Sequence, residues 1–452
     1  MPNLANNAEP AKRDKVRELQ VKLYLAAKRS PGRRFHALWD RIHRRDVLER
    51  AWRKVRENRG AAGVDRITIA QIEEQGADAF LDQLEAELKE ERYRPSPVRR
   101  VEIPKPGRSE TRPLGVPTVK DRVVGQAAKL VLEPIFEAGF HERSFGFRPK
   151  RSAHQALRAL WVEVMHERGR WVVDADIRSF FDSLDPETLM ALVGQRVSDR
   201  RVLKLVRAWL RAGVLEGEFL RRPDTGTPQG GVASPLLANI YLNALDWAWA
   251  ERHGELGVLI RYADDVVICC KSKARAEAAL EALRALLAEL SLELAEEKTR
   301  IAFLAAGEPD EVHFLGFRHR MARSRRKPGS WYLARWPSDR AMRSARQRVK
   351  ELTTLRRLRY PVEHAVRDVN RFLTGWGAYF RFGHSAEHFG EIDRYAFDRI
   401  ARLLGRKRKK RRPLHHGRGL LAEWDGLGLR PLTGRWEASL RHARMPQGEG
   451  CR

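Results

Sequence analysis

The hydrophobic positions change their spacing several times along the chain, and each change predicts a different element. From about residue 16 to residue 91 the apolar residues follow a helical pattern, which a glycine-rich turn at residues 59–65 interrupts. Residues 95–107 are extended and rich in proline, which suits the edge strands and turns of a hairpin arm rather than a central strand. Residues 112–119 supply a second extended stretch, and a helix is expected from about Asp121.

The middle of the chain contains short apolar runs that predict a buried sheet. Residues 171–177 form one strand rich in aromatic and β-branched residues. Residues 258–262 and 266–269 are two strands separated only by Ala263-Asp264-Asp265, so they predict a hairpin with acidic residues in its turn. An amphipathic helix and one more strand follow, at residues 273–290 and 312–317. This order of elements predicts a split βαβ sheet backed by helices.

Beyond about residue 335 the pattern becomes helical. Pro361 can occupy the first turn of a helix, and Ser385 can cap another. Between them the apolar residues recur at the spacing of one helix face: Val362, Ala365, Val366, Val369, Phe372, Leu373 and Trp376. These residues predict a separate helical bundle. Trp376 and Tyr379 belong to its core more readily than to a base-stacking surface.

Composition indicates a folded protein that binds a polyanion. The 452 residues suffice for two to four domains, and 42% of them are hydrophobic, which favours folding over disorder. The formal net charge is +28, an excess that normally faces nucleic acid, with an anionic membrane as the competing explanation. No apolar run approaches the roughly 20 residues of a spanning helix, and no signal-peptide pattern is present. We therefore expect a soluble protein without a membrane partner.

The three cysteines argue against a structural zinc site. Cys269 and Cys270 are adjacent, so on a strand they point to opposite faces and cannot chelate one ion. Cys451 lies far away in the sequence, and there is no Cys-x-x-Cys pair or Cys/His cluster. We expect no zinc, and we expect the adjacent pair to pack as small buried residues in a reducing compartment.

Acidic residues stand at the ends of apolar strands. Asp176 lies at the end of one strand, and Asp264 and Asp265 occupy the hairpin turn. If the two pieces are neighbours in one sheet, the three carboxylates converge at one edge. Carboxylate oxygens are ligands that Mg²⁺ prefers, and two such ions ~3.5–4 Å apart can activate a 3′-hydroxyl and stabilise the leaving pyrophosphate. The simpler explanation is that Asp favours turns, so the doublet alone does not decide.

Several motifs in a fixed order strengthen the catalytic interpretation. Residues 261–265, Arg-Tyr-Ala-Asp-Asp, resemble the palm motif of reverse transcriptases, and residues 173–182 resemble the first acidic motif of the same proteins. Residues 226–240 resemble the nucleotide-site loop and helix of the bacterial intron-encoded branch, and residues 372–380 resemble the maturase-specific thumb. Three shorter motifs stand in the family's order, at residues 144–149, 297–299 and 314–317. From about residue 40 to residue 400 the chain resembles the group II intron reverse transcriptase/maturase family.

The resemblance implies an α+β fold: a right-hand polymerase with fingers, a split βαβ palm and an α-helical thumb, the maturase domain X. We therefore expect an N-terminal extension (1–40), fingers (41–165), a palm (166–325), a helical thumb/maturase domain (326–405) and a basic C-terminal segment (406–452). The cations expected to contact nucleic-acid phosphates there are Arg406, Lys407, Arg408, Lys409, Lys410, Arg411 and Arg412. A solvated tail is the alternative for this run. About forty residues with a single Cys follow it, too few for a Cys-rich endonuclease module, so we expect the endonuclease-lacking branch.

The resemblance also implies roles for individual residues. Asp176, Asp264 and Asp265 would be catalytic and would bind two Mg²⁺ ions. Phe181 would lie beneath the incoming sugar and exclude ribonucleotides, although Phe180 or Phe181 can equally be a core residue, since adjacent side chains point to different sides. The other nucleotide-binding candidates are Arg99, Lys105, Gln229, Gly230 and Lys298. For the cations among them, a solvated surface charge or a helix-end cation is the alternative.

The implied function is RNA-directed DNA polymerase activity, which extends a 3′ end with dNTPs, together with binding of intron RNA to promote splicing and retromobility. The expected partners are an intron RNA template, a DNA primer or target and dNTPs, in the bacterial cytoplasm with RNA or the nucleoid. Two other hypotheses stay open: an RNA-binding splicing chaperone with a dispensable polymerase site, and a domesticated reverse transcriptase in defence or repair. The oligomeric state also stays open, and a homodimer is one arrangement.

Overall fold

The computed structural model of the protein describes residues 14–104, 111–212, 214–216, 219–221, 231–324, 326–407 and 428–434. The N-terminal part is built around α6 (Val119–Glu137). Consecutive residues of α6, such as Val123 and Val124, are fully buried, so the helix is enclosed on more than one face. The helices around it are α1 (Lys15–Arg29), α2 (Trp39–Ile42), α3 (Arg45–Glu57), α4 (Ile69–Gln75) and α5 (Ala77–Lys89). Of these, α1, α2 and α3 pack directly against α6.

The predicted hairpin arm is confirmed. Strands β1 (Val98–Pro104) and β2 (Thr111–Val116) pair in antiparallel register from Arg99 opposite Val116 to Pro104 opposite Thr111. At its base β1 also pairs in parallel with β4 (Val214–Glu216), which in turn pairs with β5 (Phe219–Arg221). The arm therefore shares one sheet, of order β2-β1-β4-β5, with the stretch of chain that precedes residues 222–230.

A second sheet, of order β6-β7-β3-β8, carries the acidic residues. Its strands are β3 (Trp171–Asp176), β6 (Val258–Tyr262), β7 (Asp265–Cys270) and β8 (Arg300–Phe303). Each pair of neighbours runs antiparallel. Val173 belongs to the core that this sheet shares with the N-terminal helices, whereas Val172 belongs to a second core on the other face. Because both faces are covered, the apolar runs of these strands are nearly continuous.

Helices cover both faces of this sheet. The helix α7 (Ala153–Met165) packs against β6 and β7 within the second core, and α11 (Ser234–Arg252) and α12 (Lys273–Glu289) belong to the first. The shorter elements of this region are α8 (Phe180–Ser183), α9 (Pro186–Gly194), α10 (Arg200–Arg211) and the 3₁₀-helix η1 (Glu296–Lys298). Cys269 and Cys270 are buried in opposite cores, as their adjacency on a strand predicts.

Two predictions for the strands were wrong. Asp265 is the first residue of β7, so the hairpin turn contains only Ala263 and Asp264. Residues 312–317 are not one strand that closes the catalytic sheet, because β8 occupies that edge. Instead β9 (Val312–Phe314) turns back through Leu315 and Gly316, both at positive φ, into β10 (Phe317–Arg323). With β11 (Trp331–Pro337) these strands form a third sheet of order β11-β10-β9.

The C-terminal helices form the predicted bundle. It contains α13 (Asp339–Leu352), the 3₁₀-helix η2 (Leu355–Arg359), α14 (Val362–Phe380) and α15 (Ala386–Lys407). Val362, Ala365, Val366, Val369 and Leu373 are buried, which confirms the predicted face of α14. Trp376 and Tyr379 pack against the core, and the Tyr379 hydroxyl donates to Leu315 O at 2.9 Å. Ser385 precedes α15 as predicted, but its hydroxyl donates to the carbonyl of Phe380 instead of capping the helix.

A short segment, Gly428–Gly434, packs back onto this bundle. Leu429 and Leu432 are buried there. The fully buried Asp393 of α15 accepts hydrogen bonds from the backbone N–H groups of Leu432 and Thr433 at 2.7 and 3.1 Å. The apolar residues Trp424, Leu427, Leu429 and Trp436 predict a small packed appendage; Leu429 does pack here, whereas the other three lie outside the described residues.

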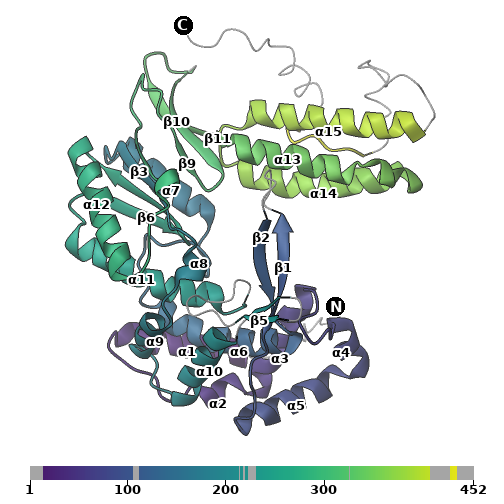
Figure 1. Cartoon of the computed structure of the whole chain (residues 1–452). Coiled ribbons are helices and arrows are strands. Elements are labelled where there is room, and N and C mark those ends of the chain that lie inside the picture. The colour runs from purple at the N-terminus through teal and green to yellow at the C-terminus, as the bar shows by residue number, and fades with distance from the viewer. Residues whose placement is uncertain are drawn as a thin grey trace, which may run out of the picture.

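Figure 1 shows how these groups are arranged. The N-terminal helices and α10 lie at the bottom, the sheet with β3 and β6 lies at the left with α11 and α12, and α13–α15 lie at the upper right. The β1–β2 arm rises from the bottom group towards the helical bundle. Within the described part of the chain, none of the helices is long and apolar enough to cross a membrane.

Candidate active site

Strand pairing brings the predicted acids together. In the antiparallel register of β3 and β7, Asp176 lies directly opposite Asp265. The β6–β7 hairpin pairs Tyr262 with Asp265, which leaves Asp264 in the two-residue turn beside them. The strand pairing therefore brings the positions of all three acids to one sheet edge, as predicted.

The electrostatics of this edge reflect the crowding of negative charge. Burial, followed by the negative charges of Asp264, Asp176 and Asp174, raises the pKa of Asp265 to about 7. Burial is also the main cause that raises the pKa of Asp264, and the charge of Asp176 adds to it. By its surface area, however, Asp265 is exposed, so solvent screens much of the repulsion and weakens this shift. A bound cation would relieve this repulsion, so the site favours one.

Asp174 is a further acid on the same strand. Residues two apart on a strand point to the same face, so Asp174 lies on the face of Asp176. Its carboxylate accepts from Arg300 Nε and from the backbone N–H of His313, both at 3.4 Å. Burial raises the pKa of Asp174, whereas Arg300 opposes that shift. The sequence did not indicate a role for Asp174. In the structure its negative charge is one of the causes that raise the pKa of Asp265.

Lys298 is a cation in direct contact with one of these acids. It ends η1, and its ammonium forms an ion pair with the carboxylate of Asp176. The backbone N–H of Ala295 donates to Asp176 O at 2.8 Å, so η1 is tied to the end of β3. The structure therefore places Lys298 at the carboxylate edge.

The donor set fits a hard divalent cation. Carboxylate oxygens at an accessible edge are the ligands that Mg²⁺ prefers, with waters and phosphates completing the octahedron. As the side chains stand, no three His, Cys, Asp or Glu residues of the described ranges converge closely enough to hold a metal ion. Lys298 supplies the balancing positive charge at Asp176 in this arrangement.

The two phenylalanines after Asp176 separate into different environments. Ser179, at a φ of 44°, turns the chain into α8. Phe180 is 3% exposed and belongs to the core. Phe181 is half-buried against that core, and the two rings meet edge-on at 5.2 Å. Of the two residues, Phe180 is therefore the core phenylalanine, and Phe181 keeps an accessible surface.

The predicted nucleotide-binding residues are placed only in part. Arg99 lies on β1, and its Nη2 donates to Ala62 O at 2.8 Å, which ties the arm to the glycine-rich turn. Lys105, Gln229 and Gly230 lie outside the described residues. Residues 231–234, which directly follow Gly230, line a cavity together with residues of α6 and of the base of the β1–β2 arm.

The predicted basic segment is also placed only in part. Arg406 and Lys407 are the last residues of α15, and Lys407 Nζ donates to Tyr360 O at 2.8 Å. Arg408, Lys409, Lys410, Arg411 and Arg412 lie outside the described residues. Their role in nucleic-acid binding stays a prediction.

One exposed aromatic next to the acids was missed. Phe147 is 51% exposed at a φ of 56°, and its ring lies 6.5 Å from that of Tyr262. The motif at residues 144–149 marked this region, but sequence spacing could not show that it lies beside the hairpin. The contact arises because Phe145 N donates to Arg261 O at 2.9 Å and extends the edge of β6.

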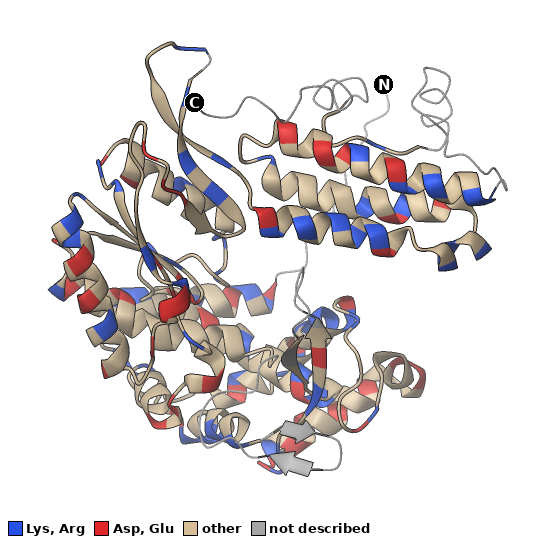
Figure 2. Ribbon diagram, turned by 45° about the horizontal axis from the view of Figure 1, so that its top comes forward, with Lys and Arg blue, Asp and Glu red and all other residues tan. Residues whose placement is uncertain are grey.

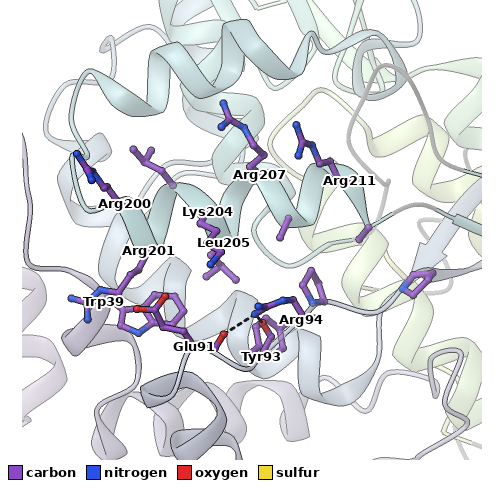
Figure 3. A pocket seen from close by; sticks show the side chains of 15 residues that line it. Trp39, Glu91, Tyr93, Arg94, Arg200, Arg201, Lys204, Leu205, Arg207 and Arg211 are labelled. Carbon is purple, nitrogen blue, oxygen red and sulfur yellow. Dashed lines mark hydrogen bonds between the residues drawn. The ribbon is translucent and has the colours of Figure 1, made fainter.

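A cavity of about 730 Å³ lies elsewhere, between α10 and residues 91–97. Exposed cations follow one another along α10 at the spacing of one helix face, and Arg94 comes from the segment that faces it (Figure 3). The cations of α10 that line the cavity are Arg200, Arg201, Lys204, Arg207 and Arg211. We call this cavity the α10 groove. Glu91 is the one acidic residue among its lining residues.

Comparison with known families now adds to this geometry. Residues 103–319 match the reverse transcriptase (RNA-dependent DNA polymerase) family, and this match contains Asp176, Asp264 and Asp265. Residues 342–419 match the maturase-specific domain of group II introns. The chain belongs to the group II intron reverse transcriptase/maturase family. It carries an RNA-directed DNA polymerase domain followed by a maturase domain, and family members use divalent metal ions.

Individual relatives agree with this membership. The chain is 35% identical to Protein YkfC of Escherichia coli K12 over 351 residues, which are 70% of this chain and 90% of YkfC. It is 38% identical to the group II intron-encoded protein LtrA of Lactococcus lactis over 216 residues, 47% of this chain and 35% of LtrA. The 91 kDa protein in the cob intron of Schizosaccharomyces pombe is 38% identical over 166 residues, 37% of this chain and 20% of that protein. The match to LtrA thus spans about a third of that protein's length.

Proposed function

We propose that this group II intron reverse transcriptase/maturase extends a DNA 3′ end along an RNA template, with two Mg²⁺ ions held by Asp176, Asp264 and Asp265. The observation that supports the proposal is the pairing of Asp176 with Asp265 across β3 and β7, with Asp264 in the adjoining turn. Three acids from two segments far apart in sequence meet at one edge. If these aspartates only stabilised turns, they would not need to lie together at one sheet edge.

The chain's own residues then have distinct tasks. Asp264 and Asp265 must be ionised to bind metal, although burial and the neighbouring carboxylates raise their pKa values. A bound cation would offset the repulsion between these carboxylates. In the reaction the 3′-hydroxyl oxygen forms a bond to the α-phosphorus of the dNTP, and the bond to the leaving pyrophosphate breaks. The metal ions would favour the hydroxyl's deprotonation and neutralise the leaving group.

The residues around the acids would handle the nucleotide. Phe181, half-buried beside the core, would lie beneath the sugar and exclude a 2′-hydroxyl. Lys298, which now pairs with Asp176, would be released to the phosphates when metal takes its place. Arg99 and Lys105 on the arm, with Gln229 and Gly230 of the loop, would hold the triphosphate and base.

Primer extension on an RNA template tests the polymerase. In the presence of Mg²⁺ and dNTPs the wild-type protein should extend a DNA primer, and Asp264→Ala should abolish extension while RNA affinity stays within about twofold. Glu255→Ala, an exposed acid on the same part of the chain, is the matched control and should extend normally. Full extension by Asp264→Ala would contradict the proposal. No extension by the wild type, together with tight intron binding, would favour a splicing chaperone.

Binding of intron RNA is a second proposed function, and the α10 groove favours it. Within the described ranges, Arg200, Lys204 and Arg211 make no ion pair, whereas Arg207 pairs with Glu187 at 3.2 Å. Unpaired, solvated cations at helical spacing can follow a phosphate backbone. Lys and Arg also occur on the other parts of the molecule, including α13–α15, where Asp and Glu are interspersed with them (Figure 2).

A triple variant tests the groove. Arg200→Ala with Lys204→Ala and Arg211→Ala should weaken intron RNA binding at least tenfold at constant salt and flatten its salt dependence. The control carries Lys271→Ala, Lys273→Ala and Arg275→Ala, which remove equal charge at the start of α12. Equal losses in both variants would show that only net charge matters and would remove the groove's special role.

A further inference from the structure

We infer that a buried polar network behind the catalytic turn, formed by Arg261, Asp246 and Asn239 together with Gly146, positions Asp264 for the polymerase reaction. The inference rests on the proposed function and adds positioning residues to it. None of these four residues belongs to the acidic edge itself. They act on the turn through its backbone.

The centre of the network is the guanidinium of Arg261. Arg261 is 1% exposed and Asp246 of α11 is 2% exposed. The guanidinium donates to both carboxylate oxygens of Asp246, from Nε at 2.7 Å and from Nη2 at 2.5 Å. A buried ion pair of this kind is weak evidence for stability, because desolvation costs about as much as the attraction returns. The geometry of this ion pair therefore suggests that it positions the turn and does not mainly stabilise the fold.

The remaining nitrogen of Arg261 reaches the turn. Nη1 donates to the carbonyl oxygen of Ala263 at 2.9 Å and to Asn239 Oδ1 at 3.2 Å. Ala263 has a φ of 57°, in the left-handed region that favours glycine, and it directly precedes Asp264. An alanine held in this conformation requires surrounding contacts that fix it. Arg261 supplies one of them, because its guanidinium is itself immobilised by Asp246.

Asn239 links this guanidinium to a second support. Asn239 is 2% exposed, and its side-chain amide donates from Nδ2 to Gly146 O at 2.8 Å. Both ends of the amide are therefore used, one by Arg261 and one by the segment at residues 144–149. A buried amide with both ends satisfied fixes the relative position of the groups it joins.

Gly146 lies directly against the turn. A Cβ atom at this position would stand 2.3 Å from Ala263 N and 2.9 Å from the carbonyl carbon of Tyr262. Only glycine permits this approach, since the neighbouring atoms are backbone and cannot swing away. Around it, Phe145 N donates to Arg261 O at 2.9 Å and Arg261 N donates to Arg143 O at 3.0 Å. The turn is thus held from behind by Gly146 and at its carbonyl by Arg261.

A displaced turn would move Asp264 away from Asp176. Misplacement of a catalytic group by about 1 Å can cost on the order of 100-fold in rate. A network that only stabilised the fold would instead lower the fraction of folded enzyme and leave the remaining molecules unchanged. The two roles therefore differ in how the surviving activity depends on Mg²⁺.

Asn239→Ala is the main test, with Asn243→Ala as its matched control. Asn243 lies one helical turn further along α11, and its amide accepts from the backbone of His141 at 3.0 Å instead of contacting the turn network. For Asn239→Ala we expect kcat to fall about 10- to 100-fold, the half-saturating Mg²⁺ concentration to rise several-fold, and the KM for dNTP to change less than about twofold. Asn243→Ala should keep the wild-type Mg²⁺ dependence.

Gly146→Ala is the second variant, with a larger expected loss of kcat and the same shift in Mg²⁺ dependence. Circular dichroism and RNA affinity establish that each variant is folded. An unchanged half-saturating Mg²⁺ concentration in folded Asn239→Ala, or equal shifts in Asn239→Ala and Asn243→Ala, would overturn the inference. Failure of the proposed function itself would appear separately, as normal extension by Asp264→Ala.

Discussion

The catalytic edge and the α10 groove use charge in opposite ways. At the edge, like charges are crowded on paired strands, and burial with mutual repulsion raises the pKa of Asp265 to about 7. In the groove, Arg200, Lys204 and Arg211 are exposed on one helix and make no ion pair with the described residues. At the catalytic edge the exact position of each carboxylate matters, because one metal ion must bind several oxygens. In the α10 groove only the summed positive charge of its cations matters. Substitutions should therefore be non-additive at the edge and additive in the groove.

The largest effect is expected from the acids themselves. Asp176→Asn and Asp264→Asn should each lower the single-turnover extension rate at least about 1,000-fold, because each removes a member of a cooperating set. The double variant should lose little more than either single one. Glu255→Gln controls for the loss of one negative charge. Losses that multiply in the double variant would show that the acids act independently and would break the contrast with the groove.

Phe181→Ala should have the next largest effect. Removing the ring should raise ribonucleotide incorporation relative to dNTP incorporation about 10- to 100-fold, a change worth about 1.4 to 2.7 kcal/mol. Competition between rNTPs and dNTPs in primer extension measures it. Phe180→Leu, altered in the core next to it, should lower the Tm and keep the discrimination. Unchanged dNTP selectivity in folded Phe181→Ala would refute the sugar-gate assignment.

Metal binding should strengthen as the pH rises towards and through the pKa of Asp265. Below a pKa of about 7 Asp265 carries a proton, which must leave before the carboxylate binds metal. The half-saturating Mg²⁺ concentration should therefore fall about fivefold from pH 6 to pH 7 and level off above pH 8. Initial rates over a grid of pH and Mg²⁺ concentration measure this. A flat profile would show that Asp265 is already ionised when the metal arrives.

Single substitutions in the groove should have the smallest effects. Arg200→Ala, Lys204→Ala or Arg211→Ala should each weaken RNA binding a few-fold and reduce the slope of log affinity against log salt by about one. The three losses should multiply, because the side chains are separated and solvated. Filter binding at several salt concentrations measures both quantities. A single variant that lost as much as the triple one would indicate one specific contact instead of a summed field.

Much of the site could be predicted because its geometry is local. The alternation of a strand and the short β6–β7 turn fix where each acid lies on its own segment. The pairing of β3 with β7, which brings Asp176 to Asp265, was expected only as part of the fold that the family resemblance implies. The helical bundle could be predicted equally well, because the spacing of buried residues along α14 is a property of one helix. The place of each acid on its own strand or turn and the buried face of α14 need no knowledge of distant partners.

The rest depended on pairings that local patterns do not contain. The strand β8 (Arg300–Phe303) is short and begins with an exposed arginine, so it did not stand out from the loop around it. The positive φ of Leu315 splits residues 312–317 into two strands, although leucine rarely adopts it. Arg261 was visible as part of a motif, but its burial was not. Arginine is normally exposed, and its partner Asp246 lies on a preceding helix.

The order of strands in the catalytic sheet has a consequence for how the protein folds during synthesis. The strand β3 lies between β7 and β8, and both of these neighbours come later in the chain. At about 5–20 residues per second, the ribosome needs roughly 5–20 seconds to deliver residue 265 after residue 176. During that time both edges of β3 lack their partners, and unpaired strand edges invite aggregation. The catalytic sheet therefore forms late in synthesis, and the nascent chain is prone to aggregation until β7 and β8 have paired with β3.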